Sequence, residues 1–413
     1  MTTRTLAIRL ASGSLAALAA VLGGCGSGHG LHTSKAAEEG QIKMSSVKSG
    51  VEYQIAHEQF MAGELAKATR TIEGAIALNP GVPKSHVLRA RIMIERGELE
   101  SARASLLRAE EIDADCVEAH YYLGIVHERF SQPEEALRRY RLASKLEPSN
   151  AQYLVASAEM LVQMKRLDEA DALLATPHEA LTHNAAIRQT RGQIAMIRGT
   201  PAPAADLFNQ ARLLAPDDAS ILEDLVRAQM AAKIYGEAEA NISTLLRTPA
   251  NTARRDLRLW RAECLAATSR LVEARSELDT LTGDRDGHSD LPSWLALGRV
   301  AAALKDDGRL RLAAQRVIAL APDRPDGYLM RAIQLRSTGD LPQALVAIDT
   351  AIRLDGDAAT PRLLRALILQ EMGFTEDAAK SVTHVLERHP GHALAGRLLA
   401  AVQSSEVYAA AGQ

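Results

Sequence analysis

The first residue that suggests chemistry is Cys25, which lies just after an apolar run and among glycines, in LAALAAVLGGCGSGHG from Leu15 to Gly30. A cysteine in this setting is a candidate metal ligand, nucleophile, disulfide partner or covalent attachment point. The chain has two other cysteines, Cys116 and Cys264, and three cysteines make a poor disulfide framework for 413 residues. We expect Cys116 and Cys264 to be small, buried helix residues.

Other residue types that bind metals are present, but their spacing argues against a metal site. Cys116, His120 and His127 share one face of a predicted helix, where His120 and His127 fall at core positions. His178 and His183 are five residues apart, whereas a zinc-binding helix needs histidines four apart. The segment GDRDGHSD has the carboxylate density of a calcium loop but lacks its spacing and closing Glu.

Catalytic motifs are also missing from the sequence. It contains no phosphate-binding P-loop, no nucleophile elbow and no complete dinucleotide-binding motif. No carboxylate pair has independent support as a general acid and base. We therefore expect no catalytic residue, no metal and no cofactor, and the chain is not expected to be an enzyme.

The N-terminus has the pattern of a secretory signal peptide. Residues 1–9 carry Arg4 and Arg9 and no acid, and residues 10–22 form an uncharged apolar run of thirteen residues. That run is shorter than the roughly 20 residues that span a bilayer.

The end of this segment, LGGC at residues 22–25, resembles the lipobox of bacterial lipoproteins. The resemblance implies removal of residues 1–24 and a lipid on Cys25. Gly26 stands where enterobacterial lipoproteins retained in the inner membrane have Asp, so the resemblance implies sorting to the outer membrane. The alternative is ordinary signal-peptide cleavage after Ala17–Ala19, in which Cys25 has no role. After Cys25, we expect a flexible tether up to residue 48, because residues 26–48 show little apolar periodicity, with a transiently helical part from Ser34 to Met44.

The composition predicts helices and argues against nucleic-acid binding. Apolar residues make up 47 % of the chain but aromatic residues only 3 %, so the apolar content is mostly Ala and Leu. The net charge is −3 and no basic stripe is present, whereas nucleic-acid binding needs one.

Beyond the tether, the sequence repeats with a period of 34 residues. An alanine follows nine of the ten predicted turns and a leucine follows the other. The steps between these positions are 34 residues except for two of 36, and the positions are Ala68, Ala102, Ala136, Ala170, Ala204, Ala238, Ala274, Leu310, Ala344 and Ala378. Twelve residues before each member stands Gly or Ala in nine of ten repeats. Four residues after each member stands a large apolar residue in all repeats except one, which has Ala314.

This pattern resembles the tetratricopeptide repeat, in which each repeat is a pair of antiparallel helices. The resemblance implies an all-α, right-handed superhelical solenoid of about ten repeats, because one pair cannot bury its own apolar face. We expect repeats 1–7 at residues 49–284, repeats 8–10 at 285–390, and a capping helix and tail at 391–413. Pro177 is expected to shorten its helix, and the polar segment near residue 285 is the expected hinge.

Function in such solenoids usually lies on the concave groove lined by the first helix of each repeat. The repeat register places ten candidate binding residues there, namely Tyr53, His57, Val87, Arg91, Tyr121, Tyr122, Glu223, Arg227, Trp260 and Arg299. Tyr53 and His57 stand where the chaperone-binding subfamily has Lys and Asn, so its carboxylate clamp is not expected.

These features predict a membrane-anchored scaffold that binds envelope proteins or peptides and supports assembly of a pilus, secretion, outer-membrane or polysaccharide-export complex. The alternatives are an enzyme accessory that binds a glycan or peptide, and a soluble periplasmic adaptor. The sequence predicts no oligomeric state.

Overall fold

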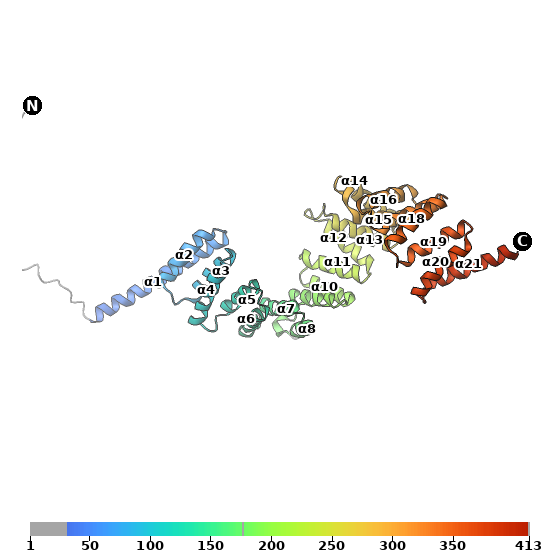
Figure 1. The fold of residues 1–413 in the computed structure, drawn as a ribbon. Coiled ribbons are helices and arrows are strands. Elements are labelled where there is room, and N and C mark those ends of the chain that lie inside the picture. Colours follow the sequence, from blue (N-terminus) through green and yellow to red (C-terminus); the bar gives the residue numbers. More distant parts are fainter. Residues whose placement is uncertain (1–30, 176, 412–413) are drawn as a thin grey trace, which may run out of the picture. The chain divides into compact units, whose positions relative to one another are not determined.

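The computed structural model describes residues 31–175 and 177–411, and it forms two compact units that divide between Lys165 and Arg166 (Figure 1). The described part of the first unit consists of seven helices, α1 (Leu31–Met61), α2 (Leu65–Leu78), α3 (Pro83–Glu95), α4 (Leu99–Ile112), α5 (Val117–Arg129), α6 (Pro133–Leu146) and α7 (Ala151–Gln163).

The described part of the second unit is also helical. Its α-helices are α8 (Leu167–Ala175), α9 (Ala185–Ile197), α10 (Pro201–Leu214), α11 (Ala219–Ala231), α12 (Tyr235–Leu246), α13 (Arg255–Ala267), α14 (Leu271–Gly283), α15 (Leu291–Leu304), α16 (Asp307–Leu320), α17 (Pro325–Ser337), α18 (Leu341–Leu354), α19 (Ala359–Glu371), α20 (Thr375–Arg388) and α21 (Ala393–Ala411). Two 3₁₀ turns, η1 (Glu179–Leu181) and η2 (Asp286–Ser289), interrupt the series.

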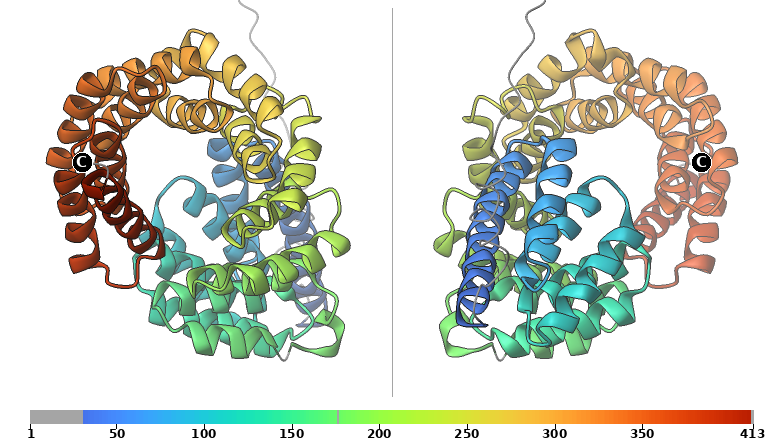
Figure 2. Two further views of the ribbon diagram at one scale, coloured as in Figure 1. Left: turned by 90° about the vertical axis from the view of Figure 1, so that its right-hand side faces the viewer. Right: turned by 90° about the vertical axis from the view of Figure 1, so that its left-hand side faces the viewer.

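The described residues contain no β-strand, which confirms the predicted all-α class. Helices α1 to α20 stand at the positions of the ten predicted repeats, and within each unit successive helices pack against one another (Figure 2). Among the described residues, no helix has both the length and the apolar character needed to cross a bilayer.

Small and large residues alternate at the repeat positions and form the core. The Gly or Ala position on each first helix is buried, and so is the large position on each second helix. A Cβ atom on Gly124 would lie 2.3 Å from Cε1 of Tyr140, and one on Gly192 would lie 2.7 Å from Cε1 of Phe208. Glycine therefore stands where the partner helix places an aromatic ring.

Each turn from a first helix to a second helix contains one residue in the left-handed region. These ten residues are Gly63, Gly97, Ser131, Lys165, Gly199, Lys233, Ser269, Lys305, Gly339 and Gly373, with φ between 56° and 83°. In the first turn, the Glu64 N–H donates to the Gln59 carbonyl at 2.8 Å, as in a Schellman motif. The same backbone geometry therefore ends the first helices.

The structure shows what happens at two predicted irregularities, the helix that ends before Pro177 and the segment near residue 285. Helix α8 has 9 residues, whereas most second helices have 14, which confirms that Pro177 shortens it. The structure divides the chain at Lys165 rather than at the hinge expected near residue 285. One core cluster runs from Ala262 to Met330 across the expected hinge, and the Trp294 indole N–H donates to the Gly287 carbonyl at 2.8 Å.

The two ends of the repeat series differ from one another. Helix α21 covers the last pair, with Ala395 and Val402 packed beside Val382 of α20, as expected for a capping helix. At the other end, the prediction of a flexible tether is wrong for residues 31–48, because α1 already begins at Leu31. The reason is local: residues 35–39 read KAAEE, a run of strong helix formers that continues α1 backwards.

Candidate protein-interaction surfaces

Aromatic side chains from three helices meet on one surface of the first unit. Tyr53, Val87 and Tyr121 are spaced by 34 residues and occupy one register position, and His57 and Arg91 occupy another. We use the name aromatic face for the half-buried side chains of this surface, which are Tyr53, His57 and Phe60 of α1, Arg91 of α3, and Tyr121 and Tyr122 of α5.

Arg91 lies between two aromatic rings of neighbouring helices. Its guanidinium carbon is 4.9 Å from the centroid of the Phe60 ring and 5.4 Å from that of Tyr122. Such cation–π contacts contribute roughly 0.5–2 kcal/mol each. The Tyr53 and His57 rings stack at 6.4 Å on the same helix as Phe60. Within the aromatic face, the Phe60 and Tyr122 rings therefore hold the Arg91 guanidinium between them.

The aromatic face continues onto α7 through Tyr121. The Tyr121 ring lies 5.2 Å from the ring of Tyr122 and 5.0 Å from that of Tyr153, at tilted or edge angles. The Gln152 amide donates a hydrogen bond of 2.6 Å to the Tyr121 hydroxyl. Rings in such a network are fixed before any ligand arrives, which lowers the entropy cost of binding.

The cations of the aromatic face have no acidic partner. Lys84 Nζ lies 4.8 Å from the Tyr53 ring centroid, and among the described residues neither Lys84 nor Arg91 forms an ion pair. Burial raises the pKa of Tyr53 and of Tyr122, so both phenols stay neutral and keep a hydroxyl hydrogen to donate. The surface therefore offers apolar rings, hydroxyl groups and two cations with free N–H groups.

The prediction that Val87 lies on an accessible groove is wrong. Val87 is buried in a core cluster with Ala90 and Leu123, and Tyr122 packs against this cluster. It shares its register position with Tyr53 and Tyr121, but the short Val side chain ends below the surface that the tyrosine rings reach. The register therefore gives the direction of a side chain, while its length decides whether it is exposed.

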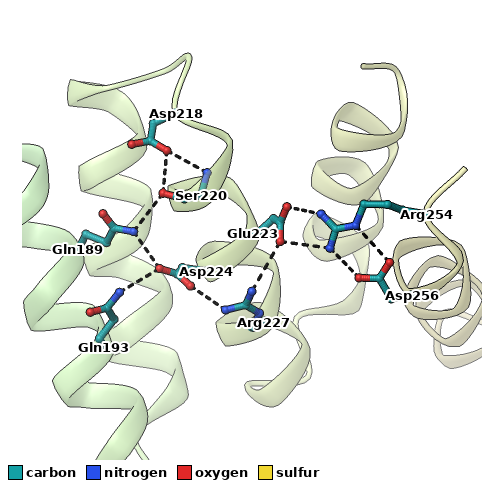
Figure 3. A network of polar contacts seen from close by, with 9 residues as sticks. All are labelled: Gln189, Gln193, Asp218, Ser220, Glu223, Asp224, Arg227, Arg254 and Asp256. Carbon is teal, nitrogen blue, oxygen red and sulfur yellow. Dashed lines mark hydrogen bonds and ion pairs between the residues drawn. The ribbon is translucent and has the colours of Figure 1, made fainter. Parts of the chain in front are cut away.

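In the second unit, the predicted residues Glu223 and Arg227 belong to an interhelix polar network (Figure 3). Arg254, which caps the start of α13, pairs with both Glu223 and Asp256, and Arg227 Nη1 donates to Asp224 at 2.9 Å. On the other side, α9 joins the network, because the Gln189 amide donates to Asp224 at 2.9 Å. These charges are already paired, so they link α9, α11 and α13 to one another.

The remaining two predicted residues lie on α13 and α15. Trp260 is half-buried against the core cluster of α11, α12 and α13. Arg299 is exposed and pairs with Glu263 at 3.6 Å. Both Arg299 and Glu263 line an apolar hollow of about 540 Å³ between helices α11 and α15, where Tyr235 and several alanines complete the wall. The sequence alone does not predict this hollow, because nothing in a series of alanines indicates whether the space beside them is filled or empty.

The candidate metal residues have structural partners. His120 is buried, and its Nε2 lies 2.8 Å from the Ala114 carbonyl; His86, one repeat earlier, makes the same contact with the Pro80 carbonyl at 2.9 Å. Burial raises the pKa of Cys264 to about 12. Within residues 31–175 and 177–411, no three His, Cys, Asp or Glu side chains are grouped as metal ligands.

The other chemical candidates lie in loops or outside the described residues. His178 caps the η1 turn, where its Nδ1 accepts from the Ala180 N–H at 3.2 Å. In the acidic segment, Asp284 and Asp290 both pair with Arg255. Cys25 lies outside the residues that the structure describes.

Several residues of these surfaces were missed in the sequence. Phe60, Lys84, Gln152 and Tyr153 contribute to the aromatic face or support it. The signal for Phe60 was available, because it stands one helical turn after His57 and the chain has only four phenylalanines.

Comparison with known proteins gives one family and two relatives. The tetratricopeptide repeat family model matches residues 59–123. Cellulose synthase operon protein C of Xanthomonas axonopodis pv. citri is 29 % identical over 387 residues, which cover 85 % of this chain and 25 % of the relative. Type IV pilus assembly protein PilF of Pseudomonas aeruginosa is 28 % identical over 148 residues, which cover 35 % of this chain and 57 % of the relative.

The chain thus spans about a quarter and just over half of the lengths of these two relatives. The crystal structure of PilW, described as a type IV pilus biogenesis factor, is 19 % identical and covers 48 % of this chain and 92 % of its own, with a TM-score of 0.43. Residues 59–123 thus match the tetratricopeptide repeat family model, and the described helices on either side of them keep the same register, so the fold is a tetratricopeptide-like helical repeat.

Proposed function

We propose that this protein is a scaffold, held at a membrane by a lipid on Cys25, whose aromatic face binds segments of other cell-envelope proteins. The observation that carries this proposal is Arg91, fixed between Phe60 and Tyr122 without an acidic partner among the described residues. Aromatic and Arg side chains on an accessible surface are the usual anchors of protein interfaces.

The chemistry of the aromatic face indicates what it binds. Its rings bury apolar side chains of a peptide, while Arg91 and Lys84 pair with carboxylates or backbone carbonyls. The polar network of the second unit has no comparable free charge, because Glu223 and Arg254 already satisfy one another. The aromatic face is therefore the proposed binding surface, and the network stabilises the stacking of its helices.

The names of the two relatives support an assembly role in the envelope. One is a type IV pilus assembly protein and the other belongs to a cellulose synthase operon. We propose that this chain likewise supports assembly of an envelope complex, on the periplasmic side of an outer membrane. No step of this role requires a catalytic residue.

Site-specific photo-crosslinking in intact cells tests the binding surface. A photo-reactive residue at His57 or Tyr122 is expected to capture the same partner, because both positions lie on the aromatic face. The same residue at Leu107 or Leu213, exposed on the second helices α4 and α10, is the matched control and should not capture it. Equal capture from all four positions, or none from Tyr122, would contradict the proposal.

Anchoring has a separate test. Replacing Cys25 with Ser removes the thiol that the lipid requires, so the protein should move from the membrane fraction to the periplasmic fraction. Two or three acyl chains give stable anchoring, whereas one gives only marginal binding. If Cys25→Ser fractionates like the wild type, the lipid anchor is disproved while the binding surface is untouched.

A further inference from the structure

The first helix of the array carries apolar side chains on its free side. Helix α1 has 31 residues, whereas the first helices α3, α5 and α7 have 13 each. Met44, Val47, Val51 and Ile55 of α1 are 61, 69, 55 and 42 % exposed. Steps of three and four residues place these side chains in one line along the helix. We call this line the open face.

The repeat register shows what normally covers such a surface. Val51 is the counterpart of Ala119, and Ile55 is the counterpart of Leu123, two repeats later. Both counterparts are fully buried in a cluster that includes Leu106 on the preceding second helix, α4. The open face is therefore the surface against which a preceding helix packs, and in α1 no described helix precedes it. An array end of this kind needs a cover, because an apolar stripe in water is unfavourable.

We propose that a second copy of this chain covers the open face, with the two α1 helices packed antiparallel about Val51. The stripe is compatible with such packing, since apolar residues spaced three and four apart form the seam of paired helices. A two-fold axis at Val51 brings each Val47 against the partner's Ile55. It also makes the contact closed, so association stops at the dimer.

Charges at the two ends of the stripe favour the antiparallel arrangement. Lys43 lies at its N-terminal end and Glu58 at its C-terminal end, about 22.5 Å apart along the helix. Within the described chain neither forms an ion pair. Antiparallel pairing about Val51 places Glu58 beside the partner's Lys43. Parallel pairing would instead bring Lys43 and Lys48 beside the partner's lysines, which costs energy.

A lipid surface is the rival occupant of the open face. Lysines beside apolar side chains also suit an anionic bilayer interface. However, α1 carries acidic residues in the same stretch, at Glu38, Glu39, Glu52 and Glu58, and an anionic surface repels them. The acidic residues therefore favour the second copy as the occupant.

Sedimentation velocity of the full chain carrying Cys25→Ser tests the proposal without any contribution from acylation. The dimer mass is expected, and Val47→Lys with Val51→Lys should reduce it to the monomer mass. Val272→Lys with Val346→Lys is the matched control, because these valines are 60 and 62 % exposed on α14 and α18 in the second unit. A monomeric parent, or a dimer that survives the α1 substitutions, overturns the proposal. Binding of the parent to anionic phosphatidylglycerol vesicles as a monomer also overturns it, in favour of the lipid surface.

Disulfide trapping tests the orientation and does not depend on the lysine variants folding. In a Cys25→Ser, Cys116→Ser background, Val51→Cys should cross-link to itself on mild oxidation. Met44→Cys and Glu58→Cys should cross-link only when the two variants are mixed. Self-cross-linking of Met44→Cys and Glu58→Cys would indicate parallel pairing and contradict the proposed geometry, and no cross-link from any of the three would reject pairing through α1.

Discussion

Arg91 owes its position to side chains on two other helices, Phe60 on α1 and Tyr122 on α5. A planar guanidinium stacks on rings and still keeps its N–H groups at the edge for a ligand, whereas a lysine ammonium has no plane to stack. The value of this residue for binding therefore comes from its shape as much as from its charge.

Substitution of Arg91 separates these two contributions. We expect Arg91→Lys to lower partner capture from Tyr122 by about 5-fold, because it loses a stacked contact worth about 1 kcal/mol, and Arg91→Ala to lower it further, because it also loses the charge. The measurement is the yield of cross-linked partner, with Arg141→Lys on α6 as a control substitution. Full capture with Arg91→Lys would show that charge alone suffices.

Gly124 illustrates how packing in the repeats is matched residue by residue. It faces the Tyr140 ring, whose hydroxyl donates to Glu128 at 2.8 Å. Where the large position holds Ile72 or Leu106, the small position holds alanine instead. In these repeats the smaller residue thus faces the larger one, whereas Gly298 stands in a repeat whose large position is Ala314 and faces Met330 instead.

We expect Gly124→Ala to destabilise the first unit by about 1–3 kcal/mol, because its Cβ atom would overlap the Tyr140 ring. Urea unfolding followed by circular dichroism measures the loss. Gly236→Ala is the control, since nothing lies within 4 Å of its added Cβ atom and alanine favours the helix by about 0.5–1 kcal/mol. A second substitution, Tyr140→Leu, should restore part of the stability that Gly124→Ala loses. If the double variant instead loses the sum of the two single losses, the proposed overlap is excluded.

At the scale of elements, the turn within each repeat is the most regular feature. Its left-handed residue is glycine in five repeats and Ser or Lys in the other five. Side chains other than glycine adopt this conformation at a cost of about 1–2 kcal/mol. The five non-glycine turns are therefore held in place by the helices that they join.

We expect Gly97→Ala to lower stability by about 1 kcal/mol and Lys233→Gly to raise it by somewhat less, because glycine loses more entropy on folding. Thermal unfolding of both variants measures the two effects. Gly50→Ala, inside α1 and without neighbours within 4 Å, should not destabilise. A destabilising Lys233→Gly would mean that the lysine side chain, rather than its backbone, matters at this turn.

The helix pairs were predictable because the same residue pattern recurs in every repeat. Pro133 and the other prolines at helix starts, the alanine series and the turn glycines all agree on one register. The sequence indicated only a transient helix from Ser34 to Met44, whereas α1 begins at Leu31, because this part of α1 lies outside the repeat pattern. For the aromatic face, the register predicted the side on which Tyr121 and Tyr122 lie but not the exposure of Val87, which side-chain length decided.

At the scale of the whole molecule, the two units differ in their acid response. The described carboxyls with a lowered pKa all lie in the second unit, at Asp171, Asp218, Asp256, Glu273, Asp290 and Asp306. Hydrogen bonds from Ser220 lower the pKa of Asp218. In the first unit, burial and the neighbouring Glu128 raise the pKa of Glu159.

The sign of the pH effect follows from these directions. A carboxyl with a lowered pKa contributes stability above its unfolded pKa of about 4, and this stability is lost as the pH falls through the lowered value. A raised pKa, as at Glu159, acts in the opposite direction. We therefore expect acid to destabilise the second unit more than the first.

Fluorescence can report the second unit alone, because both tryptophans, Trp260 and Trp294, lie in it. Between about pH 5 and about pH 3, its thermal midpoint should fall further than that of the near-ultraviolet tyrosine signal. Five of the eight tyrosines lie in the first unit, so comparing the tyrosine signal with the tryptophan fluorescence distinguishes the stability of the first unit from that of the second. If the two midpoints fall by the same amount, the expectation that acid destabilises the second unit more than the first is wrong.

The turns inside repeats keep one geometry, so the chain changes its length only between repeats. The two repeats that are two residues longer gain them in the connections at residues 247–254 and 284–290, and the helices on either side keep their register. The connection at 284–290 is tied to the core through the Trp294–Gly287 hydrogen bond, so the connection at 247–254 is the better insertion point. An epitope or a fluorescent domain placed at 247–254 would mark the protein in living cells while leaving the aromatic face and α1 as they are.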